Sequence, residues 1–234
     1  MDVAEIMAEL QAMGSESLKK ILLKHGVKEP FFGVKVEQLK TIQKKVKRDY
    51  QLARDLFATG NADAMYLAGL IADDEKMTKA DLQTWAGEAV SNNIGEYTVP
   101  WVAAEGKYGF ELAVEWINDS REHVAATGWS TLSNVAALKP DDKLDIEALK
   151  ALLARVEQNI HSSPNRVRAT MNGFIISVGT YVSPLADDAI ATAHKIGPVM
   201  VDKNGTACKT PSAADYITKA KAKGAVAKKK TVKC

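Results

Sequence analysis

Arg166 and Arg168 mark a possible phosphate-binding helix start. They follow Ser163-Pro164, and a hydroxyl residue before proline is typical of the first turn of a helix. His161 and Asn165 lie close to them in the chain. Arginine side chains and the free N–H groups of a helix N-terminus both bind phosphate. We therefore expect Arg166 and Arg168 to hold phosphate groups, with a solvated first turn as the simpler alternative.

The C-terminus is a second potential anion-binding segment. The last 16 residues contain seven lysines and no acid, so the first 218 hold 24 basic and 29 acidic residues. A lysine-rich segment adds salt-sensitive affinity for polyanions without regard to sequence. We therefore predict DNA contacts from Lys228, Lys229 and Lys230. A solvated tail that only aids solubility is the alternative, and the acidic body argues against DNA contact over the whole surface.

Other reactive residue types do not form recognisable sites. Cys208 would make a nucleophilic pair with His161 or His194 only if the fold brought them together, and a bystander cysteine is the simpler interpretation. The four histidines show no i,i+4 spacing and the chain has no Cys-x-x-Cys, so no metal site is expected. The absence of a Walker A or Gly-x-Gly-x-x-Gly motif gives no support to a nucleotide cofactor.

Length and composition are those of an ordinary globular protein. The chain has 234 residues, 46% hydrophobic and 26% charged, enough for one large domain or two small ones. No apolar run approaches the ~20 residues of a membrane span. The N-terminus lacks the features of a signal peptide, and two cysteines are too few for a disulfide framework. A cytoplasmic location without membrane association follows.

Helical spacing of apolar residues dominates the chain. Thr78 and Asp81 have the spacing of a capping box, Thr210-Pro211 is a further helix start, and the tryptophans lie in apolar patterns typical of a core. One strand-like segment, 199–201, precedes Asn204-Gly205, a hairpin turn signal. The expected helices cover 2–12, 16–25, 34–46, 52–58, 62–71, 78–90, 99–104, 108–117, 121–137, 144–160, 164–178, 184–195 and 211–223.

Paired short helices along a whole chain favour an α-solenoid, because each helix is too short to be stable alone. The predicted fold is all-α, a solenoid of HEAT-like helix pairs with a small C-terminal hairpin and a basic tail. We place the helical repeat domain at 1–197, the hairpin and a helix at 198–223, and the tail at 224–234. A compact irregular helical domain is the alternative.

The segment Phe31-Phe32-Gly33-Val34-Lys35, followed by Leu39 and Ile42, resembles the N-terminal motif of the bacterial DNA alkylation repair family. These proteins are HEAT-like alkylpurine DNA glycosylases. The order of later helices agrees over about residues 15–195, and 201–209 resembles one branch of the family. The resemblance implies a concave basic surface for duplex DNA. It also implies excision of N3- or N7-alkylated purines.

The resemblance assigns a catalytic carboxylate to Glu96 and an aromatic wall against the lesion to Phe174. It places Asn92 where the family has a tryptophan and Val124 where it has a DNA-contacting arginine, with Arg121 one turn away as a substitute. We therefore expect a DNA-binding protein that acts as a glycosylase on alkylated or structured duplex DNA. The alternative is a non-catalytic helical-repeat protein that binds DNA structures or a protein partner.

Overall fold

The computed structural model describes residues 1–224 and 226–233. These residues form helices and connecting loops, and no strand occurs among them. The elements are α1 (Val3–Met13), α2 (Glu16–Lys24), α3 (Val36–Val46), α4 (Tyr50–Phe57), α5 (Ala62–Ile71), α6 (Lys79–Glu88), the π-helical turn η1 (Ile94–Thr98), α7 (Val99–Glu105), α8 (Gly109–Trp116), α9 (Glu122–Leu138), η2 (Asp141–Lys143), α10 (Ile146–Asn159), α11 (Asn165–Tyr181), η3 (Ser183–Leu185), α12 (Ala186–Ile196) and α13 (Ala213–Ala222).

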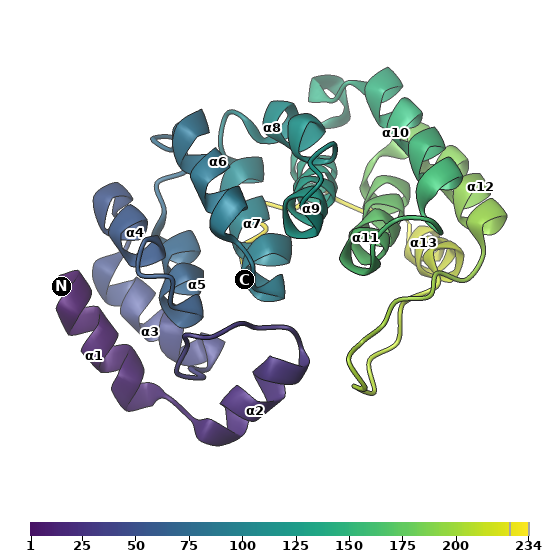
Figure 1. Ribbon diagram of the computed structural model, residues 1–234. Helices are drawn as coiled ribbons and strands as arrows, with labels where there is room; N and C mark the ends of the chain where they lie inside the picture. The colour runs from purple at the N-terminus through teal and green to yellow at the C-terminus, as the bar shows by residue number, and fades with distance from the viewer. Residues whose placement is uncertain (225, 234) are drawn as a thin grey trace.

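The helices form two rows that curve along the chain (Figure 1). In the inner row, α5, α7, α9, α11 and α13 follow one another, and each contacts the next. In the outer row, α4, α6 and α8 pack on α5, α7 and α9, and α10 packs on α12. Neighbouring helices bury each other's apolar faces, which stabilises elements too short to persist alone. The predicted all-α solenoid is confirmed.

Buried side chains form two clusters along the solenoid, one from α1 to the start of α9 and one from α8 to α13. All four tryptophans belong to these clusters and are at most 3% exposed, so the core packing predicted for most of them holds for all four. No helix in the described part of the chain is long and apolar enough to cross a lipid bilayer.

Helix boundaries follow side-chain caps. Thr78 and Asp81 form the predicted capping box at the start of α6, with each side chain accepting from the other's backbone N–H. The predicted cap at Thr210 is wrong, because Ser212 accepts from the N–H of Asp215 and α13 begins at Ala213. Ser163 does not cap α11 either, since its hydroxyl donates back to the carbonyl of Asn159. A proline near a helix start predicts reliably that a helix follows, but it predicts less reliably at which residue the helix begins.

Backbone N–H groups of the segment 31–35 bind one buried carboxylate. The N–H groups of Phe32, Gly33 and Val34 donate to Asp63 over 2.6, 3.0 and 3.2 Å. Asp63 lies in the first turn of α5, so its carboxylate joins α5 to the loop that follows α2. Gly33 has a φ of +80°, and a Cβ there would lie 2.6 Å from the carbonyl oxygen of Ser15. The motif therefore attaches the first helices to the solenoid.

The segment 198–209 folds back on itself without forming a β-hairpin. Its turn is the predicted one, since Asn204 and Gly205 have φ of 53° and 71° and Thr206 N–H donates to the carbonyl of Lys203. The expected strand pairing is absent. The side-chain amide of Asn165 donates to the carbonyl of Asp202 and accepts from its N–H, at 3.0 and 2.7 Å. Because Asn165 of α11 makes the hydrogen bonds to the Asp202 backbone, the segment is a loop anchored to a helix start. We call it the 198–209 loop.

We predict that Asp63→Ala lowers the free energy of unfolding by about 3 kcal/mol, because three backbone donors lose their acceptor. Urea denaturation followed by circular dichroism measures the change. Asp55→Ala is the matched control, since Asp55 is exposed on α4, where its carboxylate accepts from Gln51. Its effect should stay within about 0.5 kcal/mol. Equal effects of the two changes would contradict the anchoring role of Asp63.

Candidate nucleic-acid interface

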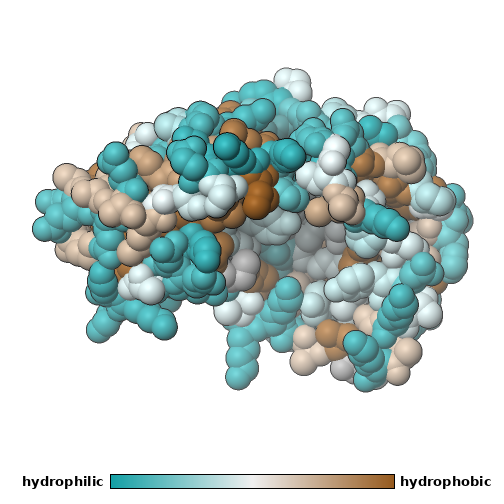
Figure 2. All heavy atoms as spheres, turned by 90° about the horizontal axis from the view of Figure 1, so that it is seen from below, coloured by the Kyte–Doolittle hydropathy of each residue, from teal (hydrophilic) through white to brown (hydrophobic). Residues whose placement is uncertain are grey.

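A cleft lies where the starts of the inner helices meet α2 and the 198–209 loop. Two adjoining cavities of about 300 and 240 Å³ form it, and both are lined by Asn92, Glu96, Arg166 and Asn204. α2 and the loop project on the same side of the solenoid (Figure 1). Seen from that side, hydrophilic side chains project around a recess (Figure 2). The concave face therefore has a central cleft with two projecting walls.

Glu96 and Arg166 form an ion pair at the centre of this cleft. Arg166 Nε donates to Glu96 Oε1 at 2.6 Å and Nη2 donates to Oε2 at 2.5 Å. The two side chains are 11% and 22% exposed. Glu96 comes from the η1 turn and Arg166 from the first turn of α11, so the pair joins two elements 70 residues apart in sequence. Glu96, the predicted catalytic carboxylate, and Arg166, the predicted phosphate-binding arginine, therefore bind each other.

A second carboxylate holds the start of α11 in place. Glu122, in the first turn of α9, accepts from the backbone N–H of Arg166 at 2.6 Å. Burial opposes the charge of the Arg166 guanidinium, but its hydrogen bonds and charge attraction to Glu96, with its charge attraction to Tyr97 and Glu122, together outweigh burial and raise the pKa of Arg166. The guanidinium therefore stays charged, and the negative charge of Glu96 is compensated within the protein.

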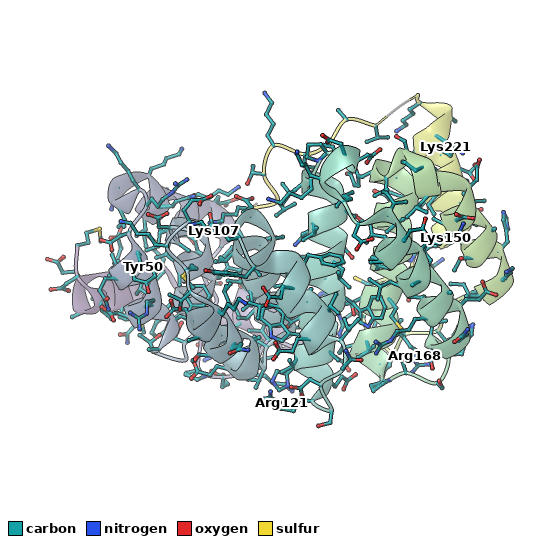
Figure 3. All side chains as sticks on the ribbon, turned by 90° about the horizontal axis from the view of Figure 1, so that it is seen from above. Tyr50, Lys107, Arg121, Lys150, Arg168 and Lys221 are labelled. Atoms are coloured by element: carbon teal, nitrogen blue, oxygen red, sulfur yellow. The ribbon has the colours of Figure 1, made fainter. Side chains whose placement is uncertain are left out.

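The other predicted site residues lie apart from this pair. Phe174 is fully buried and packs on Trp129, with ring centroids 5.2 Å apart, so its ring is a core element and cannot face a base as predicted. Arg121 donates to Asp119 through Nε and Nη2, at 2.9 and 2.7 Å. These hydrogen bonds lower the pKa of Asp119 to about 2. Arg168 is half-buried (Figure 3), and its Nε is buried without a partner among the described residues.

The lysines beside the cleft were not predicted as site residues from the sequence. Lys24 and Lys28 lie at the end of α2 and just after it, and Lys203 lies on the 198–209 loop. None of the three forms an ion pair within the described residues, whereas Lys45 on α3 pairs with Glu9. A single lysine in a helix or loop carries no distinctive sequence signal. Only the fold shows that these three lie around one cleft.

The C-terminal tail packs along the body instead of extending into solvent. Lys228 Nζ donates to the carbonyl of Ala136 and pairs with Asp141 at 2.8 Å. The backbone N–H of Lys229 donates to Ala137, and its ammonium lies over the ring of Tyr181. Two of the three predicted DNA-binding lysines are thus engaged with the protein, while Lys230 is exposed.

The end of the tail reaches the first half of the solenoid. Glu105 accepts from the Thr231 hydroxyl and from the N–H of Val232, which is 8% exposed and belongs to the first core cluster. Lys233 pairs with Asp74 at 2.7 Å, and these two side chains are 12% and 10% exposed. We call residues 226–233 the C-terminal strap. It runs along the side opposite Arg121 and Arg168 (Figure 3).

Cys208 and His194 both line a cavity of about 510 Å³ between the 198–209 loop, α12 and α13. Cys208 is exposed, but neither histidine considered as its partner bonds to its sulfur in the described part of the chain. His161 Nε2 instead lies 2.8 Å from the carbonyl oxygen of Ile196. No cluster of three or more potential metal-ligating side chains occurs among the described residues.

The paired helices define a HEAT-like helical-repeat protein. The family model described as DNA alkylation repair enzyme matches residues 6–214, so the chain belongs to this family. A protein of Listeria innocua, uncharacterized protein Lin0241, is 30% identical over 223 residues, covering 93% of this chain and 96% of its own. Uncharacterized protein Lmo0209 of Listeria monocytogenes shows the same identity and coverage.

A solved structure is similar over the whole of both chains, with a TM-score of 0.91 and 34% identity. It is described as that of a new family of proteins related to the HEAT-like repeat DNA glycosylases with affinity for branched DNA structures. The family and the HEAT-like fold proposed from the motif at 31–35 are thus confirmed.

We predict that Lys233→Gln lowers the free energy of unfolding by about 2 kcal/mol, because the mostly buried Asp74 carboxylate loses its cation. Thermal and urea denaturation measure the loss. Lys230→Gln removes the same charge from an exposed position of the strap and should change stability by less than about 0.5 kcal/mol. A strap that lies free in solution would make the two variants equally stable.

Proposed function

We propose that this protein binds branched DNA structures and does not excise alkylated bases. The observation that carries the proposal is the doubly hydrogen-bonded pair of Glu96 and Arg166. Affinity for branched DNA is ascribed to the solved relative that is 34% identical over the whole chain. A DNA-binding role agrees with the cytoplasmic location expected from the sequence.

The chemistry of base excision argues against a catalytic Glu96. Loss of a cationic alkylpurine leaves positive charge on the sugar, and a nearby carboxylate stabilises that charge only if its own charge is available. Both oxygens of Glu96 already accept from Arg166. Separating a largely buried ion pair costs several kcal/mol, because each charge loses its partner in a poorly solvated place. Asn92 and the buried Phe174 offer no aromatic face in place of the family's tryptophans.

The lysines around the cleft support the DNA-binding part of the proposal. Lys24 and Lys28 lie on one wall of the cleft and Lys203 on the other. Lysines attract phosphates without reading bases, and their position decides which shape of DNA they fit. Two projecting walls with cations suit DNA arms that leave a branch point in different directions. A straight duplex would engage fewer of these lysines at once.

The decisive experiment compares base release with binding on the same preparations. We expect no release of N7-methylguanine or N3-methyladenine from methylated duplex DNA, either by the wild type or by Glu96→Gln. We expect tighter binding of three-way and four-way junctions than of linear duplex of the same length. Release that depends on Glu96 would establish a glycosylase instead. Failure to bind any DNA would contradict the proposal and favour a protein partner as the ligand.

Lys24→Ala and Lys203→Ala should each weaken junction binding and reduce the salt dependence of log K by roughly one unit for each phosphate that the variant no longer neutralises. Lys230→Ala is the matched control, because Lys230 is an exposed lysine on the C-terminal strap, away from the lining of the cleft. Fluorescence anisotropy over a range of salt concentrations measures both quantities. A larger effect of Lys230→Ala than of the cleft variants would place the DNA elsewhere.

A further inference from the structure

We infer that the cleft holds an unpaired nucleotide at the branch point of the DNA, with its base against Tyr97. This inference rests on the proposed function and adds the part of the branched DNA that the cleft recognises. Three features of the cleft support it: an exposed aromatic ring, two buried polar atoms without partners, and cations at its edge.

The aromatic ring belongs to the η1 turn beside Glu96. Tyr97 lines the smaller cavity and is 53% exposed. Its ring centroid lies 6.3 Å from that of Trp101, which is 3% exposed and makes an edge-on contact with Tyr66 at 5.2 Å. The buried ring of Trp101 thus supports Tyr97 on one side, while much of the Tyr97 surface stays accessible. Unpaired bases stack on such rings, because every base has a flat π face.

Two residues that line the same cavity each carry a buried polar atom without a hydrogen-bond partner among the described residues. Asn93 Oδ1 and Thr206 Oγ1 are both buried, and both residues line the cavity that Tyr97 lines. A buried polar atom without a partner is unfavourable, so such atoms favour a ligand that satisfies them. The amide oxygen accepts and the hydroxyl both donates and accepts. The edge of a nucleobase carries donors and acceptors side by side and suits this pair.

Charge at the edge of the cavity suits the phosphates of the same nucleotide. Lys24 and Lys203 lie on opposite walls, whereas Arg166, which lines the same cavity, is paired with Glu96. A base inside a duplex cannot reach the cavity, because its edge and both faces are already occupied. A branch point with an unpaired nucleotide offers a free base together with phosphates on either side. The cavity therefore recognises unpaired nucleotides, whereas the walls recognise the DNA arms.

The test compares a linear duplex, the same duplex with a single unpaired adenine, and a three-way junction with unpaired nucleotides at its branch point. We expect the unpaired adenine to raise affinity about tenfold over the linear duplex. Tyr97→Ala should remove this gain, and Tyr97→Phe should keep it, because phenylalanine stacks equally well. Tyr216→Ala, a change at a tyrosine on α13 that is also 53% exposed, should leave it unchanged.

A 2-aminopurine in place of the unpaired adenine reports stacking directly. Its fluorescence should fall on binding of the wild type and Tyr97→Phe, but not of Tyr97→Ala. If junctions bind tightly while the unpaired base adds nothing, the inference is wrong and the proposed function stands. An equal loss of affinity for all three DNAs in Tyr97→Ala would also overturn it, since that would indicate a structural role. If no DNA binds, both proposals fail together.

Discussion

The ion pair between Glu96 and Arg166 determines what the concave face can do. It joins the η1 turn to the first turn of α11, and Glu122 holds the same helix start through a backbone N–H. Asn165, the neighbour of Arg166, holds the 198–209 loop. One helix start therefore sets the position of the cleft floor and of one wall. A change of charge at this point would alter the shape of the site as well as its chemistry.

The segment 31–35 has a comparable role for the opposite wall. Its aromatic and glycine residues are the recognisable part of the motif in the sequence. The hydrogen bonds that attach the segment, however, come from three backbone N–H groups that donate to Asp63. α2 has no buried residue of its own, so its position depends on the segments before and after it. A family motif here reflects the attachment of a wall of the cleft rather than contact with a ligand.

Sequence reasoning succeeded where the signal was local and failed where it depended on distant partners. Helix order, the Thr78 cap and the Asn204-Gly205 turn are local features, and all three are present. Phe174 was misjudged because the resemblance matched its position in the chain but not its surroundings: α11 lies in the inner row, packed against helices on several sides, and buries this ring. The partner of Arg166 lies 70 residues away, a distance over which spacing predicts nothing. The tail lysines were assigned to DNA, or alternatively to solvent, because the carboxylates that pair with Lys228 and Lys233, Asp141 and Asp74, come next to them only in the folded chain.

The C-terminal strap makes this solenoid differ from an open array of repeats. In such an array each repeat contacts only its neighbours, so the ends can unravel while the middle persists. Here Lys233 bonds to Ala72 and Asp74, across 161 and 159 residues of sequence. The first and last parts of the chain are thereby tied together, and loss of either should loosen the other. During synthesis the first half would lack this tie until residues 226–233 leave the ribosome, so the strap would dock only after the helices that it joins have emerged.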